Sequence, residues 1–309
     1  MSTGTTDTPA QKTVLITGAN GQLGYELQKT APAHIRVIAT GSDTLDITRS
    51  RQVSLALEQY EPDCIINAAA YTAVDKAESD PEAAYLINNT AAALIAQAIV
   101  ARVEDGKPAI KLIQVSTDFV FDGQQATPYT TDSPTDSPLG VYGASKLAGE
   151  QAVVRYLPDA LIVRTSWLYS SHGNNFVKSM LRLMKEKDQL GIVYDQVGSP
   201  TWAATLADTI WALLDQNSRG IYHCSDNGVA SWYDFAAAIQ EQAVESGLLS
   251  RAIPLHPIRS SEYPTPAKRP AYSVMDKSTT EQVLGKTLPH WRESLHLMLT
   301  ELKQQTDNA

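Results

Sequence analysis

The chain has 309 residues, which is long for a single compact core and predicts two domains or one enlarged domain. Hydrophobic residues make up 43% and charged residues 19%, which is typical of a soluble globular protein and not of a disordered chain. The net charge of -9 argues against nucleic acid as a general partner, and no apolar run reaches the length that a membrane-spanning helix needs.

The N-terminus and the cysteines indicate the cellular compartment of the protein. The first twelve residues have no apolar signal-peptide core, and we expect a disordered leader there. Cys64 and Cys224 each fall in an apolar, strand-like run, which favours buried free thiols over a disulfide or a metal site. These features predict a cytoplasmic protein.

The first half of the chain alternates short apolar runs with helical patterns. The predicted strands are 13–19, 35–40, 64–70, 110–117 and 161–167, and the predicted helices are about 22–31, 49–60, 81–102 and 142–156. The apolar runs do not alternate with polar residues, so we expect strands that are buried on both faces. Strands separated by helices predict an α/β fold of the Rossmann type, with a doubly wound parallel sheet.

After residue 170 the helical patterns lengthen, and a Pro-rich connection follows at 263–270. This change predicts a first domain over 12–170 and a smaller C-terminal region over 171–309. The segment at about 203–226 is expected to return to the first domain, where 221–226 adds one more strand. The second region then consists mainly of 171–202 and 227–305.

A glycine-rich turn joins the first predicted strand to the first helix. Gly18, Gly21 and Gly24 follow the spacing G-x-x-G-x-x-G. A turn without Cβ atoms lets backbone N–H groups and the helix N-terminus approach a pyrophosphate. A plain glycine turn is the alternative, but the strand-turn-helix context favours a dinucleotide phosphate site.

The end of the second strand bears on which dinucleotide binds. A carboxylate usually ends this strand and binds the ribose hydroxyls, whereas this chain has Gly41 and Ser42 there. Without a negative charge to repel a 2′-phosphate, the pattern favours NADPH and leaves NADH open. Asp46 and Ile47 could flank the adenine, with a helix N-cap at Asp46 or Thr48 as the alternative.

Small and hydroxyl-bearing residues end the next two strands. Three alanines at 68–70 either leave room for a flat ligand or serve tight helix–sheet packing, and the sequence leaves both open. Ser116, Thr117 and Asp118 end the following strand, where turn formation is the ordinary role of such residues. The ends of parallel strands meet at one edge of a sheet, so these segments should share one crevice.

Tyr142 and Lys146 stand four positions apart at the start of a predicted helix and therefore share one face of it. A tyrosine has a pKa near ~10 and is a poor acid or base at neutral pH. We expect the Lys146 ammonium, beside a positively charged nicotinamide, to lower the pKa of Tyr142. Tyr142 would then protonate a carbonyl oxygen that Thr117 polarises, while Lys146 also holds the nicotinamide ribose.

These motifs resemble the extended short-chain dehydrogenase/reductase superfamily. Within it, "GQLGYELQ", "NAAAYTAVDKAE", "STDFVFDG", "YGASKLAGE", "RTSWLY", "GNNFVKSML", "DQVGSPT" and "YPTPAKRP" are similar to the dTDP-4-dehydrorhamnose reductases, from about residue 12 to about 303. The resemblance implies that NADPH or NADH reduces the C4 keto group of dTDP-4-dehydro-β-L-rhamnose, the last step of dTDP-rhamnose synthesis. It makes 12–170 the NADP(H)-binding domain and 171–309 the substrate-binding region.

The resemblance also implies roles for individual residues. Those facing the dinucleotide would be Gly18, Asn20, Gly21, Gln22, Leu23, Gly24, Ser42, Asp46, Ile47, Ala69, Ala70 and Tyr71, together with Tyr142 and Lys146. Thr117 and Asp118 would contact the sugar, and Trp167 would pack beside the substrate, with core packing as the alternative. Arg269 would bind the substrate pyrophosphate, with a surface basic pair as the alternative.

One position departs from the family pattern. Some members carry magnesium at a dimer interface through three glutamates, of which Glu26 and Glu301 match two. The third position is Ala204, and the loss of one carboxylate weakens a site for a hard cation. We therefore expect no metal, and both glutamates have ordinary interpretations at a helix N-terminus and on an exposed helix face. A homodimer remains open.

Two other functions share the fold. The regulatory beta subunit of methionine adenosyltransferase binds NADP(H) and another protein without reducing a sugar. The presence of all of Thr117, Tyr142 and Lys146 favours an enzyme. Another nucleotide-sugar reductase or an epimerase is the second alternative, and only the motif match argues against it.

Overall fold

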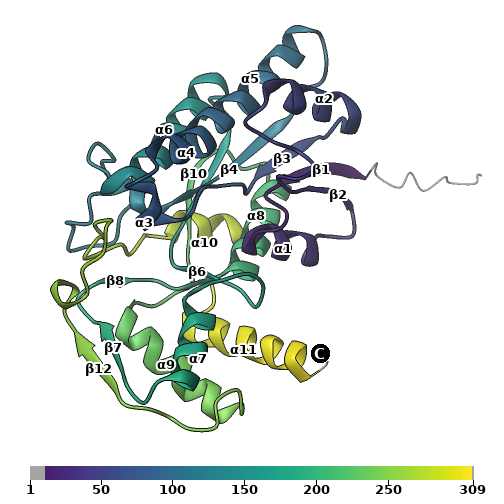
Figure 1. Ribbon diagram of the computed structural model, residues 1–309. Coiled ribbons are helices and arrows are strands. Elements are labelled where there is room, and N and C mark those ends of the chain that lie inside the picture. Colours follow the sequence, from purple (N-terminus) through teal and green to yellow (C-terminus); the bar gives the residue numbers. More distant parts are fainter. Residues whose placement is uncertain (1–10, 308–309) are drawn as a thin grey trace, which may run out of the picture.

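A six-stranded parallel sheet forms the centre of the molecule, in the order β10-β5-β4-β3-β1-β2 (Figure 1). The computed structural model describes residues 11–307, so the expected leader lies almost wholly outside the described residues. The strands are β1 (Lys12–Thr17), β2 (Ile35–Thr40), β3 (Cys64–Asn67), β4 (Lys111–Thr117), β5 (Leu161–Thr165) and β10 (Gly220–Cys224). Every neighbouring pair in this sheet is parallel, which confirms the predicted fold class.

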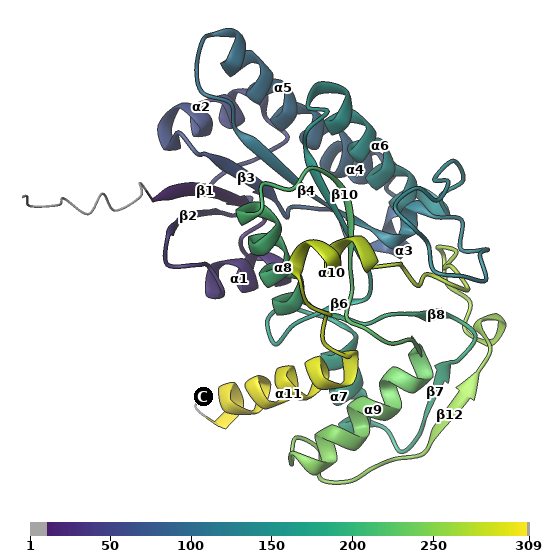
Figure 2. The ribbon, with the colours of Figure 1, turned by 180° about the vertical axis from the view of Figure 1, so that it is seen from behind.

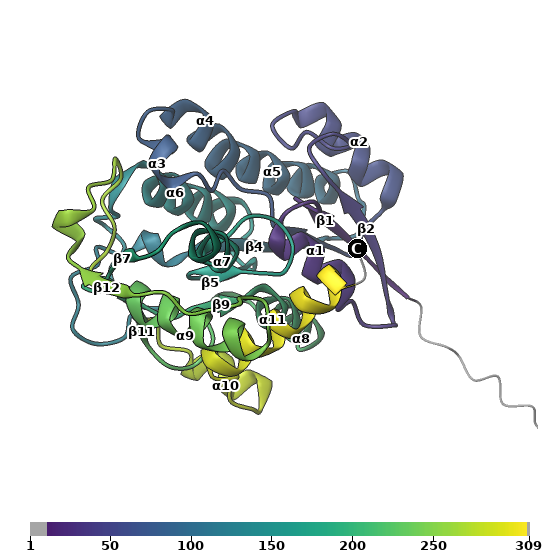
Figure 3. The same cartoon turned by 60° about the horizontal axis from the view of Figure 1, so that its bottom comes forward.

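Helices cover both faces of the sheet (Figure 3). One layer contains α1 (Gln22–Lys29) and α8 (Ala203–Asp215), and the other contains α2 (Ser50–Tyr60), α5 (Ala91–Glu104) and α6 (Gly140–Tyr156). Adjacent residues of a strand point to opposite faces. Leu15 packs with the α2 and α5 layer and Ile16 with the α1 and α8 layer, which is why the strands read as unbroken apolar runs.

The helix predicted over 81–102 is interrupted. It consists of α4 (Pro81–Tyr85), a π-turn η1 (Leu86–Thr90) and α5. By length and composition alone the run 81–104 could cross a bilayer, so the prediction that no run is long enough was wrong. Ile95 and Ile99 of this run are buried in the core, which accounts for its apolar composition as that of a core helix.

The C-terminal half packs its own apolar cluster below the sheet (Figure 2). Its elements are β6 (Leu168–Tyr169), α7 (Phe176–Glu186), β7 (Leu190–Val193), β8 (Val197–Gly198), β9 (Thr201–Trp202), β11 (Ala230–Ser231), α9 (Trp232–Glu245), β12 (Leu255–Ile258) and α11 (Trp291–Asp307). The helix α10 (Ser278–Leu284) instead packs beside the sheet, against α8 and β10. The remaining short elements are α3 (Val74–Ala77), η2 (Asp118–Val120) and η3 (Ser260–Glu262). As predicted, the chain returns to the sheet through β10, which pairs with β5. The division into two domains stays a prediction.

Three predicted strands end earlier than expected. β1 stops at Thr17, two residues before the predicted end, where the glycine turn begins. β3 stops at Asn67, so the alanines that follow form an extended loop instead of a strand end. β5 stops at Thr165, because Trp167 has a backbone φ of +46°, a left-handed conformation that is rare for a bulky residue and incompatible with a strand. Cys64 and Cys224 are free and buried, as predicted.

Candidate active site

A cavity of about 860 Å³ lies at the carboxyl ends of the sheet strands, where ligands of open α/β sheets bind. The predicted residues that line it are Gly18, Asn20, Gly21, Gln22, Leu23, Ser42, Asp46, Ile47, Ala69, Ala70, Thr117, Asp118, Tyr142, Lys146 and Trp167. Three predicted residues, Gly24, Tyr71 and Arg269, do not line it. The cavity therefore joins the glycine turn to the Tyr142 and Lys146 face of α6.

The glycine turn is tight at both of its ends. Gly18 has a φ of +69°, and a Cβ there would lie 2.7 Å from the backbone of Ala69. A Cβ at Gly24 would lie 2.3 Å from the Gly18 carbonyl oxygen, so Gly24 is required for packing although it does not face the cavity. Gly21 is the N-cap of α1 and offers no side chain to the first turn, which leaves those N–H groups open towards the cavity.

The cavity wall at the end of β2 carries small residues. Gly41 and Ser42 line it, whereas the Thr40 hydroxyl turns inward and donates to the Ile16 carbonyl at 2.9 Å. Asp46 accepts hydrogen bonds from the Thr48 backbone and hydroxyl, and the hydroxyl bond lowers the pKa of Asp46. Asp46 is not a helix N-cap, because α2 begins only at Ser50.

Lys146 is buried, and its ammonium donates to the Val115 carbonyl at 2.6 Å. Burial lowers the pKa of Lys146 to about 8, although the nearby Glu150 carboxylate raises it. Glu150 lies one turn further along α6 and is itself held in a buried pair with Arg164, with a distance of 2.7 Å between Glu150 Oε2 and Arg164 Nη2. The lysine is thus held by β4 through a hydrogen bond, and the Glu150 carboxylate on its own helix favours its charged form.

The pKa of the Tyr142 phenol is set mainly by burial. Burial raises its pKa to about 12, a hydrogen bond with Thr117 lowers it, and the Asp118 charge raises it. Burial of the phenol is the largest influence on this pKa, and the Lys146 ammonium is bonded to Val115. The consequence is a phenol that keeps its proton throughout the neutral range. The lowering expected from Lys146 beside a nicotinamide stays a prediction.

Thr117 and Asp118 end β4 beside Tyr142. The Thr117 hydroxyl donates to Asp118 Oδ1 at 2.9 Å and accepts from the Phe119 backbone N–H at 3.2 Å. Burial raises the pKa of Asp118 to about 6, while hydrogen bonds from Ser273 and Thr117 lower it. The site thus combines a buried hydroxyl, ammonium and carboxyl group with the half-buried side chain of Tyr142 around one part of the cavity.

Trp167 lines the cavity at the start of the C-terminal half. Its ring stacks on that of Trp232 with centroids 3.5 Å apart and planes 4° from parallel. A bulky residue held at positive φ is strained, and such strain is found preferentially at functional sites. Trp167 thus packs against Trp232 and also lines the cavity.

Tyr71 and Arg269 lie outside the cavity wall. The Arg269 guanidinium makes a two-bond pair with Asp75, with Nη2–Oδ2 and Nη1–Oδ1 distances of 2.7 and 3.0 Å. Tyr71 exchanges backbone hydrogen bonds with the side chain of Asn88. Their predicted roles towards substrate and cofactor stay predictions.

Asn88 is a buried residue that the sequence did not single out. It sits in the π-turn η1, and its amide also donates to the Ser145 hydroxyl at 3.0 Å, between Tyr142 and Lys146 on α6. π-turns inside helices are frequent at functional sites, but no sequence pattern marks them. Asn88 therefore joins the loop after β3 to the helix that carries Tyr142.

Comparison with known proteins places the chain in a family. A family model described as the RmlD substrate binding domain matches residues 12–304. A dTDP-4-dehydrorhamnose reductase of Burkholderia thailandensis is 39% identical over 303 residues, which covers 94% of this chain and 99% of that protein. The chain belongs to this family.

Solved structures of the family share the fold of this chain. The crystal structure of a dTDP-4-dehydrorhamnose reductase from Clostridium acetobutylicum has a TM-score of 0.86 and 40% identity, covering 94% of this chain and 99% of that one. The enzyme from Bacillus anthracis, solved in complex with NADP, has a TM-score of 0.86 and 38% identity over the same shares. The family assignment thus agrees with the resemblance expected from the motifs.

The three positions at which the resemblance implies magnesium carry two carboxylates and one methyl group in this chain. Glu26 and Glu301 lie on either side of the Lys29 ammonium, 3.7 and 2.5 Å from it, and the third position is the buried methyl group of Ala204. A cation already stands between the two carboxylates. Glu301 is also not the exposed acid that the sequence predicted, because its side chain is only 18% exposed in this pair.

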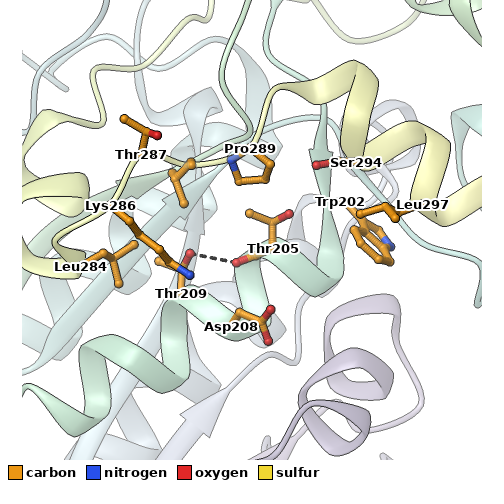
Figure 4. Close-up of a pocket in the computed structure, with 11 residues that line it drawn as sticks. Trp202, Thr205, Asp208, Thr209, Leu284, Lys286, Thr287, Pro289, Ser294 and Leu297 are labelled. Carbon is orange, nitrogen blue, oxygen red and sulfur yellow. Dashed lines mark hydrogen bonds between the residues drawn. The ribbon is translucent and has the colours of Figure 1, made fainter.

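A second cavity, of about 210 Å³, lies between α8 and the connection from α10 to α11 (Figure 4). Its walls combine Leu284 and Leu297 with Asp208 and Lys286. Burial raises the pKa of Asp208, while a hydrogen bond from Thr30 and the Lys286 charge lower it. The residues predicted for the reaction all lie elsewhere, so we assign this cavity no part in the chemistry.

Proposed function

We propose that the protein transfers hydride from NADPH, or from NADH, to C4 of dTDP-4-dehydro-β-L-rhamnose and so forms dTDP-β-L-rhamnose. The observation that carries this proposal is the convergence of Thr117, Tyr142 and Lys146 in the cavity that begins at the glycine turn. Membership of the dTDP-4-dehydrorhamnose reductase family supports the choice of substrate.

The residues present suit a dinucleotide. The open first turn of α1, with Gly21, Gln22 and Leu23 in the cavity wall, would bind the pyrophosphate. Ser42 would face the adenosine ribose or its 2′-phosphate, and Asp46 and Ile47 the adenine. The NADP complex of the Bacillus anthracis enzyme supports the same choice of cofactor.

When bound, the nicotinamide supplies the hydride that adds to the carbonyl carbon. Tyr142 then donates its phenolic proton to the carbonyl oxygen, which completes the alcohol. Its pKa of about 12 keeps that proton in place until the oxygen becomes basic. Thr117 would turn its hydroxyl proton from Asp118 to the same oxygen, and the Lys146 ammonium would stabilise the phenolate that remains.

The substrate would enter from the C-terminal half. Asp118 would bind a sugar hydroxyl and Trp167 would pack against a sugar or nucleobase face, since both line the cavity. For Arg269 to bind the substrate pyrophosphate it would exchange Asp75 for phosphate, a bidentate partner of the same kind. Two free buried cysteines fit the reducing cytoplasm as the compartment.

The test is NADPH oxidation followed at 340 nm with dTDP-4-dehydro-β-L-rhamnose. The control substrate is dTDP-4-dehydro-6-deoxyglucose, which offers the same keto group on a different sugar. We expect turnover with the first compound and little with the second. Equal rates with both, or no oxidation with either, would contradict the proposal.

A further inference from the structure

Residues 170–175, which we call the strap, run from the C-terminal half across the glycine turn. His172 Nε2 donates to the Asn20 carbonyl at 3.0 Å, and the His172 ring stacks on Tyr25 with centroids 4.5 Å apart. The Asn175 amide donates to Gln22 Oε1 at 2.9 Å. Since Asn20 and Gln22 line the large cavity, the strap covers the loop that is proposed to hold the pyrophosphate.

Two carboxylates hold the beginning of the strap. The Ser170 hydroxyl donates to Glu26 Oε1 at 2.6 Å, and the Ser171 hydroxyl donates to Glu301 Oε1 at 2.7 Å. Glu26 lies on α1 and is fully buried, whereas Glu301 lies on α11 near the C-terminus. The strap is therefore anchored on helices from opposite ends of the chain.

Lys29 is the cation of this anchor. Its ammonium lies 2.5 Å from Glu301 Oε2 and 3.7 Å from Glu26 Oε2. Burial raises the pKa of Glu26, whereas Ser170 and Lys29 lower it and the charge of Glu301 raises it. Two neighbouring carboxylates, one of them buried, repel each other and need a positive charge to stay ionised.

We propose that Lys29 takes the place of a divalent metal here, and that its ammonium, through Glu26 and Glu301, fixes the strap over the dinucleotide loop. Lys29 is then a positioning residue for the cofactor, acting through two carboxylates and two serine hydroxyls. The inference rests on the proposed dinucleotide site. It adds that cofactor retention is set by an intramolecular ion pair and needs no magnesium.

The variant Lys29→Met tests this with three readouts. These are the Kd for NADPH from its fluorescence, the KM values for NADPH and for the sugar nucleotide, and hydrogen exchange of the strap. Each is repeated with EDTA and with magnesium. We expect Kd and KM for NADPH to rise about fivefold, which is the effect of losing one partly exposed ion pair. Exchange of 170–175 should accelerate, and KM for the sugar nucleotide should stay the same.

Three further variants sharpen the result. Lys29→Arg keeps the charge and should restore affinity. Glu301→Gln keeps an acceptor for Ser171 but removes the charge, so it should reproduce the loss of NADPH affinity. It serves as the test if Lys29→Met fails to fold. Arg251→Met breaks an exposed pair with Asp188 elsewhere and should leave Kd unchanged.

The proposal is overturned if Lys29→Met and Glu301→Gln keep the wild-type Kd and strap exchange. It is also overturned if the wild-type protein loses NADPH affinity in EDTA and regains it with magnesium. A wild-type protein that binds no NADPH at all would instead remove the proposed function on which this inference rests.

Discussion

Burial acts in the same sense on the two ionisable groups of α6 that face the cavity, since it favours the neutral form of each. It raises the pKa of Tyr142 to about 12 and lowers the pKa of Lys146 to about 8. The phenol therefore holds its proton at neutral pH, as a reductase acid must, while the lysine is poised near the working range. One helix turn thus carries an acid and a titrating cation.

The variant Tyr142→Phe tests the acid. We expect the protein to fold and bind NADPH as before, but to lose at least about a hundredfold in kcat, the usual scale for a removed general acid. Steady-state turnover, beside the NADPH Kd as a control for the cavity, is the measurement. Turnover close to that of the wild type would show that another group supplies the proton.

The lowered pKa of Lys146 predicts how the rate of reduction depends on pH. Because its pKa is lowered to about 8, the ammonium is present below that pH and is lost as pH rises through it. We expect kcat/KM to fall on a limb near pH 8, well below the pKa of Tyr142. In Lys146→Arg, whose charge does not titrate in this range, the limb should disappear from any residual activity. A wild-type rate that is flat to pH 10 would rule out a role for this titration.

At the scale of elements, the sequence predicted well what depends on neighbouring residues. The strand-turn-helix at Gly18 and the four-residue spacing of Tyr142 and Lys146 are local patterns, and both lie where expected. The early end of β5 was missed, because no local propensity indicates a positive φ at Trp167, whose ring stacks on the distant Trp232. The π-turn around Asn88 was missed for the same reason, since its bonds go to Tyr71 and Ser145.

The anchor of the strap was out of reach of any local pattern. Lys29 and Glu301 are 272 positions apart, so no periodicity relates them. From the sequence each glutamate had an ordinary helical interpretation, and only their convergence on Lys29 gives them a common role. Contacts between distant helices depend on the whole fold, which composition and spacing do not determine.

The end of β2 allows a test of cofactor preference. In Ser42→Asp a carboxylate would face the proposed 2′-phosphate, so we expect kcat/KM for NADPH to fall relative to NADH. Ser42→Asn is the matched neutral control and should change the ratio little. Gly41 is the poorer position, because a Cβ there would lie 2.4 Å from the Asn20 amide and disturb the cavity wall. If Ser42→Asp leaves the NADPH to NADH ratio unchanged, the adenosine pocket lies elsewhere.

At the scale of the whole molecule, the two halves are interleaved along the chain. α8 and β10 follow α7 in sequence, yet their Leu206, Ile210 and Cys224 are buried in the core of the sheet. The second cluster, around Phe235 and Leu295, is then completed by α9 and α11 from later in the chain. Each core contains residues from segments that come before and after segments of the other core in the sequence. This interleaving couples the stabilities of the two cores.

This coupling predicts a single unfolding transition that responds to damage in either core. Leu295 and Leu297 form a matched pair on α11, because Leu295 is fully buried and Leu297 is 53% exposed. We expect Leu295→Ala to lower the free energy of unfolding by about 2–5 kcal/mol, the cost of a truncated core leucine. Leu297→Ala should change it by less than about 0.5 kcal/mol. Urea unfolding followed by far-UV circular dichroism and by tryptophan fluorescence should give coincident curves for all three proteins. An early fluorescence transition in Leu295→Ala, with the helical signal retained, would show that the C-terminal half unfolds independently of the sheet.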